Sequence, residues 1–185
     1  YNAAMERILY DGRPFIHPAA LDGMRQRTLT IGSASKELRM IGWRVGWVVG
    51  PAAVMREIGL VSISDVVVPV GIAQGAVAAA LAEPAQDVLE AVATWEARRD
   101  LIVAELEGLP LRKPAGGWSM LLDAGALGLT GAQASGRLFE QGQVAATAMD
   151  NWGIAHGAQY VRLVFSNEPV ERLAGIGERF RRSLL

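Results

Sequence analysis

The sequence contains no cysteine, so neither a disulfide framework nor a catalytic or metal-binding thiolate can be part of this chain. The absence of disulfides is compatible with a reducing compartment, and we expect a cytoplasmic protein. Histidine is scarce as well, and neither His17 nor His156 lies in a pattern typical of catalysis. His17 precedes a proline, as expected for a surface residue, and His156 lies in a glycine-rich loop. No metal site is expected.

The chain also lacks an excess of charge of either sign. Its 18 Lys and Arg residues and 19 Asp and Glu residues give a formal net charge of -1. Because there is no basic stripe to neutralise phosphates, nucleic acid is not expected as a partner.

One long hydrophobic run raises the question of a membrane span. The 17 residues between Asp65 and Glu83 are interrupted only by Gln74, which is near the lower length limit for crossing a bilayer. The run nevertheless contains a proline and two glycines, and its second half is mostly alanine, which is weakly hydrophobic. It therefore predicts a buried helix after Pro69, and no membrane partner is expected.

The overall pattern is that of an α/β protein. With 185 residues, 51% of them hydrophobic, the chain can form one domain or two small ones. Two apolar runs without clean alternation, Arg27–Ile31 and Trp43–Val49, predict strands buried on both faces of a parallel or mixed sheet. Further strands are predicted at Trp118–Asp123, Val144–Thr147 and Tyr160–Ser166, and helices at Ala52–Ser64, at Val70–Ala82, from Asp87 to Gly108, after Thr130 and after Pro169, with a helical turn at Ala19–Arg25.

A lysine in a small-residue turn is the first candidate functional residue. Lys36 directly follows the predicted strand that ends at Ile31, within the string Ser-Ala-Ser-Lys. An amine held at the end of a strand can attack a carbonyl and form a Schiff base, provided that burial and neighbouring cations keep it partly unprotonated. The alternative is an ordinary solvated turn, because lysine next to serine is common in such turns.

The residues around this lysine suit a phosphate. The hydroxyls of Ser33 and Ser35 are small donors, and Arg44, which lies between two glycines, offers a planar fork of N–H groups. An aldehyde-reactive amine beside a phosphate site matches the two reactive handles of pyridoxal 5'-phosphate (PLP). PLP is therefore the predicted cofactor.

The combined string, Ser-x-Ser-Lys followed after five residues by Gly-x-Arg-x-Gly-Trp, resembles the lysine signature of class I/II aminotransferases, the fold-type I PLP enzymes. The resemblance extends over nearly all of the chain. Four further segments resemble the family in order and spacing: the Asp-x-x-Tyr segment at Asn2–Gly12, the helix into the small domain at Glu96–Leu101, a glycine-rich turn and strand at Ala115–Asp123, and the carboxylate-binding strand at Tyr160–Ser166.

The resemblance implies a role for each matching residue. Lys36 would form the Schiff base with PLP and then move the proton between Cα and the cofactor. Ser33 and Arg44 would hold the phosphate, and Arg162 would bind the substrate α-carboxylate. The alternative for Arg162 is a salt-bridged strand arginine. Trp118 would line the substrate pocket or pack in the core, and the second role is the commoner one for tryptophan.

Two residues depart from the family pattern. Asn2 stands where the family has an aspartate against the pyridine nitrogen, and Met5 stands where it has a tyrosine against the ring hydroxyl. Methionine cannot donate that hydrogen bond. Asn2 is still predicted to lie at the cofactor, but as a neutral amide.

The family's upstream elements, namely a glycine-containing phosphate loop, a stacking aromatic and an asparagine beside the ring hydroxyl, are not in this sequence. We therefore expect the C-terminal half of a longer subunit. Residues 1–85 would end the large PLP-binding domain with its mixed sheet, and residues 86–185 would form the small α/β domain. The expected partners are the missing N-terminal half and a second subunit of a homodimer.

The expected function is amino transfer between an amino acid and a 2-oxo acid, and the fragment alone is expected to be inactive. Three alternatives remain open. A PLP-dependent C–S β-lyase shares the site and differs in the fate of the substrate carbanion. An aminotransferase-like effector domain of a transcription regulator would follow a DNA-binding module. The last alternative is a catalytically silent fragment.

Overall fold

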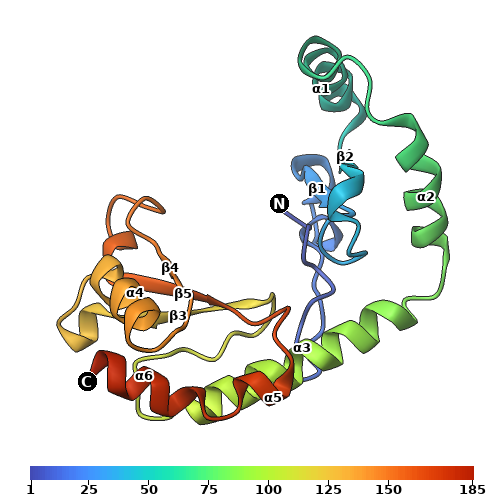
Figure 1. Cartoon of the computed structure of the whole chain (residues 1–185). Coiled ribbons are helices and arrows are strands. Elements are labelled where there is room, and N and C mark those ends of the chain that lie inside the picture. Colours follow the sequence, from blue (N-terminus) through green and yellow to red (C-terminus); the bar gives the residue numbers. More distant parts are fainter. The chain divides into compact units, whose positions relative to one another are not determined.

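A computed structural model describes residues 1–185, which form an α/β fold in two compact units, residues 1–91 and 92–185. The units divide within helix α3, and each is described here by itself. Unit 1 contains β1 (Thr30–Ser33), β2 (Gly46–Val49), α1 (Ala52–Asp65), α2 (Gly71–Ala82), the start of α3 (Gln86–Glu105), and the short 3-10 helices η1 (Pro18–Ala20), η2 (Arg25–Arg27) and η3 (Ile41–Trp43). Unit 2 contains the rest of α3, β3 (Ser119–Asp123), η4 (Gly125–Leu127), α4 (Gly131–Glu140), β4 (Thr147–Ala148), η5 (Gly157–Gln159), β5 (Tyr160–Val164), α5 (Val170–Leu173) and α6 (Ile176–Leu184) (Figure 1).

The sheet of unit 1 is small and mixed. β1 and β2 pair antiparallel, with Ser33 opposite Gly46, while Asn2 forms a parallel bridge to Ile31. The ring of Trp47 lies so close to Gly32 that a Cβ atom there would come within 2.1 Å of the indole nitrogen. Glycine is thus required in the middle of β1, because any side chain would displace the tryptophan.

Both predicted strands of unit 1 begin later than the sequence suggests. Residues 25–27 form a 3-10 turn, so that β1 starts at Thr30 and runs to Ser33. Ile41–Trp43 likewise turns, and β2 starts at Gly46. The strands were predicted from apolar character alone, and this character does not indicate where the backbone turns. The helices at 52–65 and 71–82 lie within one residue of their predicted bounds.

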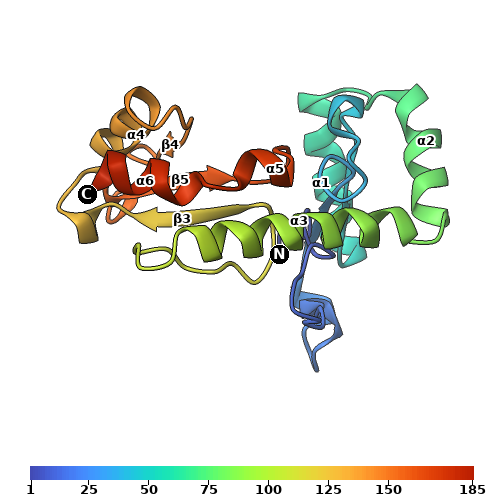
Figure 2. The same cartoon turned by 60° about the horizontal axis from the view of Figure 1, so that its bottom comes forward.

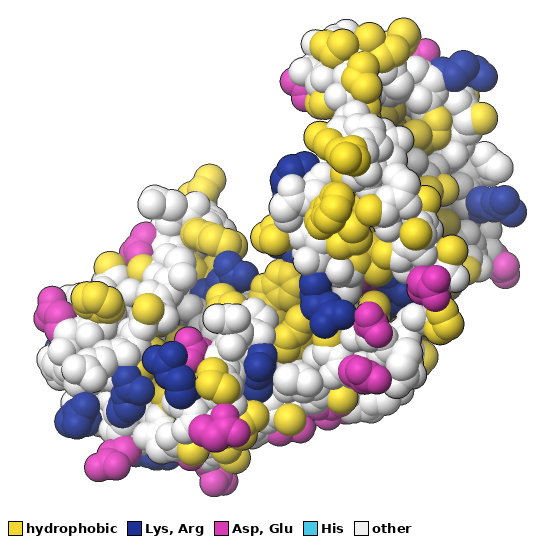
Figure 3. Space-filling model, turned by 45° about the vertical axis from the view of Figure 1, so that its right-hand side comes forward, with side chains coloured by type: hydrophobic (Ala, Val, Ile, Leu, Met, Phe, Trp, Pro, Cys, Tyr) yellow, Lys and Arg dark blue, Asp and Glu magenta, His cyan; other side chains and the backbone are white.

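The expectation that the strands are buried on both faces is wrong for this chain taken alone. Thr30 and Gly32 are buried, but Ile31 is 51% exposed and Val49 is 59% exposed. α1 buries none of its residues, and the segment after it exposes three consecutive valines, Val66–Val68. Figure 3 shows apolar side chains gathered over the part that carries α1 (top). Exposed apolar side chains of this kind are typical of surfaces that take part in an interaction.

None of the helices combines the length and the apolar character that a membrane span needs. This includes α2, the helix predicted after Pro69. The prediction that this helix is buried is wrong for this chain taken alone, because only Ala73 and Val77 of α2 are buried.

Unit 2 is built on a three-stranded antiparallel sheet in the order β3-β5-β4. α4 contacts β4, β5 and α6. The alternating residues Val161 and Leu163 of β5 are buried, whereas Arg162 between them projects on the opposite, open face beside Leu121 of β3. The helix predicted after Thr130 begins with a full capping box, in which Thr130 and Gln133 satisfy each other's backbone N–H groups.

The other predicted elements of unit 2 are present but shorter. β5 ends at Val164, and the strand predicted at Val144–Thr147 is reduced to Thr147–Ala148. The C-terminal helix is broken at Gly175, which has φ +76° and separates α5 from α6. Glycine adopts this left-handed conformation without the steric cost that other residues meet.

The start of α6 packs on the end of α3 through one carboxylate (Figures 1 and 2). Glu105 accepts hydrogen bonds from the backbone N–H of Gly175 at 2.9 Å and of Gly177 at 3.1 Å. These bonds favour the ionised form and lower the pKa of Glu105 below its usual 4.5. Since the folded value lies below the unfolded one, the carboxylate stabilises the fold above about pH 4.5, and this gain is lost as the pH falls through the lower folded value.

We therefore expect Glu105→Gln to lower the free energy of unfolding at neutral pH by about 1 kcal/mol, the usual cost of losing a helix cap. The difference from the unaltered protein should shrink as the pH falls below 4.5. Denaturant unfolding at neutral pH and below pH 4.5 measures this difference in the free energy of unfolding. Glu107→Gln is the matched control, because Glu107 is exposed. A pH-independent difference would contradict a role for the charge.

Candidate functional site

The candidate lysine lies in a closed turn at the end of β1. The turn is held by a hydrogen bond from the amide of Met40 to the carbonyl of Ala34, 3.1 Å long, and by one from the amide of Ala34 to the carbonyl of Val45, also 3.1 Å. Ala34 is completely buried, and Lys36 is half-buried beside it. The local sequence favours this geometry because only small residues fit between the strand and the turn.

The three residues predicted to bind phosphate lie together around this turn. The guanidinium of Arg44 donates to the hydroxyl of Ser35 at 3.4 Å and to the carbonyl of Ile41 at 2.7 Å. The amide of Ser35 donates to the hydroxyl of Ser33 at 3.2 Å. We call Ser33, Ser35 and Arg44 the anion site. One guanidinium with two hydroxyls has the donors that a phosphate dianion needs, so the residues present fit the phosphate of PLP.

Arg44 is held in an unusual backbone conformation. Its φ is +55°, in the left-handed region that non-glycine residues rarely enter. Such strain persists only where the surroundings impose it, and it is enriched at ligand sites. Here the side chain's bond to the carbonyl of Ile41 fixes the guanidinium beside Ser35.

Asn2 lies next to the same strand. Its parallel bridge to Ile31 places it two residues before Ser33 in the β1 register. The side-chain oxygen of Asn2 accepts a hydrogen bond from the amide of Ala4 at 3.0 Å, so it serves the local turn. Met5 is 37% exposed. Neither residue supplies an acid or a hydroxyl, and the pyridine ring of PLP would find a less complementary site here than its phosphate does.

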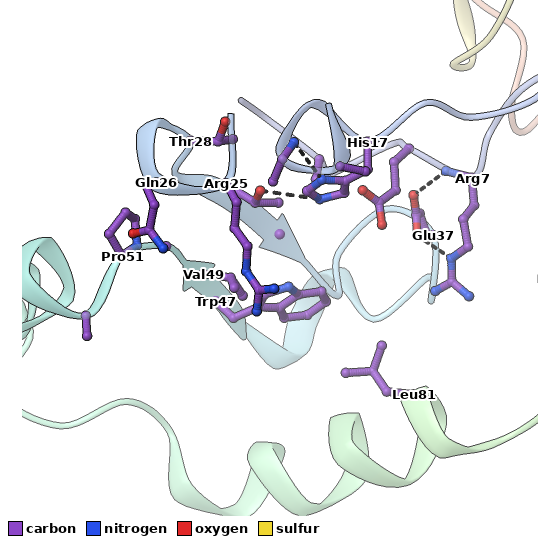
Figure 4. Close-up of a pocket in the computed structure, with 18 residues that line it drawn as sticks. Arg7, His17, Arg25, Gln26, Thr28, Glu37, Trp47, Val49, Pro51 and Leu81 are labelled. Atoms are coloured by element: carbon purple, nitrogen blue, oxygen red, sulfur yellow. Dashed lines mark hydrogen bonds and ion pairs between the residues drawn. The ribbon is translucent and has the colours of Figure 1, made fainter. Parts of the chain in front are cut away.

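An ion pair that the sequence did not signal ties the Asn2 segment to the lysine turn. Glu37, whose side chain is 7% exposed, accepts from the amide and from the Nε of Arg7, both at 2.7 Å (Figure 4). The two residues are 30 positions apart. No local sequence pattern pairs Arg7 with Glu37. The only signal in the sequence was that a glutamate directly follows the candidate lysine.

A cavity of about 890 Å³ in unit 1 lies on the other face of the sheet (Figure 4). Trp47, Thr30 and Gly32 line it, and none of the anion-site residues does. Because side chains alternate along a strand, Ser33 projects away from this cavity. Glu6 also lines it. Its Oε2 is buried without a hydrogen-bond partner, and burial, followed by the charge of Glu37, raises its pKa.

His17 borders the same cavity and is more enclosed than its predicted surface position implies. Its Nδ1 accepts from the amide of Ala19 at 3.1 Å, and its Nε2 lies 3.3 Å from the hydroxyl of Thr30. The ring therefore caps η1 and joins it to β1, which is a structural role. His156 is exposed, as its loop position suggests.

Arg162 occupies the middle of the sheet in unit 2. It lies opposite Leu121 on β3 and Thr147 on β4, with its side chain half-exposed. It forms no ion pair with a carboxylate; its guanidinium carbon instead lies over the ring of Trp152, 5.2 Å from the centroid. The structure therefore does not support the alternative in which Arg162 is a salt-bridged residue of the strand. A guanidinium that is not paired with a carboxylate of its own chain can bind an external one.

Trp118 has the environment of a packing residue. Its ring meets Trp95 of α3 edge to face, with centroids 5.9 Å apart, and its backbone carbonyl accepts from the amide of Phe165 at 3.0 Å. Trp118 is only half-buried, so the core role and the pocket role both stay predictions. The seven predicted site residues thus divide between the units, with Asn2, Ser33, Ser35, Lys36 and Arg44 in unit 1 and Trp118 and Arg162 in unit 2.

The chain matches the family of aminotransferases of class I and II over residues 8–176. Among characterised relatives, arginine–pyruvate transaminase of Pseudomonas aeruginosa is 34% identical over 167 residues, which are 88% of this chain and 42% of that protein. Aspartate/prephenate aminotransferase of Thermus thermophilus is 32% identical over 184 residues, 97% of this chain and 46% of that protein.

The solved structures agree. The aromatic aminotransferase of Pyrococcus horikoshii superposes with a TM-score of 0.89 at 30% identity, over 98% of this chain and 49% of that one. The chain thus spans about half the length of the relatives it matches. These relatives are aminotransferases, and neither a β-lyase nor a transcription regulator is favoured.

Proposed function

The chain belongs to the class I and II aminotransferases, and we propose that it is the C-terminal part of a PLP-dependent subunit that transfers an amino group between an amino acid and a 2-oxo acid. The observation that carries the proposal is the Lys36 turn, in which the candidate lysine directly follows Ser33 and Ser35 of the anion site at the end of one strand. A PLP enzyme needs these two features side by side.

The residues of this chain divide the work. Ser33, Ser35 and Arg44 bind the phosphate of PLP. Lys36 would hold PLP through its amine and would carry a proton to and from the substrate Cα, and Arg162 would bind the substrate carboxylate. When bound, PLP supplies an electron-withdrawing ring that acidifies the Cα–H bond of an attached amino acid. The protein's own contribution is to position the substrate and to move that proton.

We further propose that residues 1–85 complete the PLP-binding large domain and that residues 86–185 form the small domain. The partners are the N-terminal half of the same subunit and a second subunit in a homodimer. Two observations support them: the chain spans about half of its relatives, and Ile31, Val49 and the valines after α1 expose apolar side chains that a further layer would cover.

Reconstitution of the complete subunit with PLP tests the proposal. We expect a visible absorbance band of the bound cofactor, its conversion on addition of an amino acid, and formation of the matching 2-oxo acid. A screen of amino acids against pyruvate and 2-oxoglutarate identifies the substrates. Absence of both a cofactor band and any amino transfer would refute the proposal, and release of a thiol or ammonia without amino transfer would indicate a lyase.

Asn2 provides a test of the cofactor's ring environment. A buried carboxylate keeps a proton on the pyridine nitrogen by pairing with it, and a neutral amide offers no such charge. We expect Asn2→Asp in the complete subunit to raise the rate of amino transfer at least about tenfold, which corresponds to about 1.4 kcal/mol of barrier, because the added carboxylate favours the protonated pyridine ring.

Affinity for PLP should change little in the Asn2→Asp variant, because the anion site is untouched. Asn2→Ser is the matched control, since it changes the side chain without adding charge. Equal rates for the unaltered enzyme and the aspartate variant would mean that another residue serves the ring nitrogen.

A further inference from the structure

Trp152 is an exposed aromatic side chain in a loop that is fixed at its base. The loop joins β4 to η5, and 59% of the tryptophan is exposed. The amide of Trp152 donates to the carbonyl of Met149 at 2.9 Å, and the amide of Met149 donates to the carbonyl of Tyr160 at 3.2 Å. A Cβ atom at Gly157 would come within 2.4 Å of the carbonyl oxygen of Met149, so the two ends of the loop are in tight contact.

This anchoring places the indole over one specific cation. The guanidinium carbon of Arg162 lies 5.2 Å from the ring centroid of Trp152, within the range of a cation–π contact. Arg162 is itself held in the central strand by β3 and β4 on its two sides. Both partners thus start from fixed backbone positions, and the contact follows from the fold.

The contact with Trp152 leaves the guanidinium of Arg162 able to bind an anionic ligand. A cation–π contact covers one side of a guanidinium and restricts its torsion angles, and the N–H groups that are not directed at the ring remain available to a carboxylate. Because Arg162 has no internal carboxylate partner, no protein group competes for those N–H groups. An arginine that is already oriented and partly desolvated pays less on binding an anion.

We propose that Trp152 is a positioning residue, which orients the guanidinium of Arg162 and so strengthens carboxylate binding there. The proposal rests on the proposed function of Arg162 as the substrate-carboxylate residue. A purely structural role is disfavoured by the exposure of Trp152: with 59% of its surface in solvent, its contribution to packing is small. Its removal should affect ligand binding far more than folding.

The test uses the complete, PLP-loaded subunit and 3-phenylpropanoate, a carboxylate without an amino group, whose dissociation constant is measured by calorimetry. Trp152→Leu should raise that constant about three- to tenfold, the range of one cation–π contact at a partly exposed site. Trp152→Phe keeps an aromatic face and should stay within about twofold of the unaltered protein. Phe139→Leu is the matched control, because Phe139 is 67% exposed on α4.

Kinetics separate positioning from catalysis. Trp152→Leu should raise KM for the amino acid by a similar factor and leave kcat almost unchanged, because the carboxylate contact is made equally before and during the reaction. The midpoint of thermal unfolding should stay the same in all three variants.

If Arg162→Ala weakens 3-phenylpropanoate binding and Trp152→Leu does not, the role of Trp152 is wrong and that of Arg162 stands. If Arg162→Ala leaves binding unchanged, the carboxylate role of Arg162 fails, and the role of Trp152 fails with it. A Trp152→Phe variant as weak as Trp152→Leu would also overturn the proposal, because the aromatic face would then not be what matters.

Discussion

Lys36→Ala should abolish covalent binding of PLP and lower the rate of amino transfer by at least about a thousandfold. The lysine has two proposed tasks, since its amine bonds to the cofactor and then moves a proton at the substrate Cα. A positioned side chain that moves a proton contributes about 10²–10⁴-fold by itself, and loss of the nucleophile adds to this. The anion site is intact in the variant, so PLP should still bind reversibly through its phosphate.

Reduction with borohydride locates the bond. In the unaltered protein we expect a stable pyridoxyl adduct on the peptide that contains Lys36, identified by mass spectrometry. This chain has only one other lysine, Lys113, whose Nζ is 3.0 Å from a carboxylate oxygen of Asp100. Lys113→Ala is therefore the matched control and should keep both the adduct and the activity. An adduct on Lys113, with a coloured Lys36→Ala variant, would show that the assignment of Lys36 is wrong.

The residues proposed for the anion site could be selected from the sequence because they are close together in the chain. Ser33, Ser35, Lys36 and Arg44 lie within twelve positions, and the chemistry of each residue type limits what such a cluster can bind. The structure adds how they are held, namely the left-handed backbone of Arg44 and the closure of the turn over buried Ala34. A short sequence motif thus indicates which residues form a site better than it indicates their backbone conformation.

The strand ends could not be predicted because tertiary contacts decide them. Arg27 and Trp43 have the apolar or β-favouring neighbours of a strand, yet both lie in 3-10 turns that lead into the sheet. The position of β1 is set instead by the contact of Trp47 with Gly32 and by pairing with the segment around Asn2. Propensity is a weak guide where such contacts compete with it.

Interactions between distant residues were likewise beyond the sequence. The Arg7–Glu37 pair joins residues 30 positions apart, and the contact of Trp152 with Arg162 depends on how a loop folds back over a strand. Charge or aromatic character at each position was visible, but nothing in a single sequence says which cation meets which ring. These two contacts are the parts of the candidate site that only the structure provides.

Arg162→Ala should weaken use of the amino acid about ten- to a hundredfold or more, seen mainly as a higher KM. A bidentate pair of guanidinium and carboxylate has two charge-assisted hydrogen bonds, each worth about 1.5–3 kcal/mol. The structure makes this expectation sharper, because Arg162 projects from the open face of the sheet and has no internal carboxylate to satisfy. Removing it should therefore cost binding energy without leaving a buried, unpaired acid behind in the protein.

Arg162→Lys tests whether carboxylate binding needs the two parallel N–H groups of the guanidinium or only a positive charge. Lysine keeps the positive charge but cannot form two parallel bonds to one carboxylate, nor stack flat on the ring of Trp152, so it should recover little of the lost affinity. Arg137→Ala, at an exposed position on α4, controls for a general loss of positive charge. The PLP absorbance of all three variants should match that of the unaltered enzyme, because the anion site lies in the other unit. Unchanged KM in both Arg162 variants would leave this arginine as a residue of the sheet surface, and the substrate carboxylate would then have to be bound by another cation of the subunit.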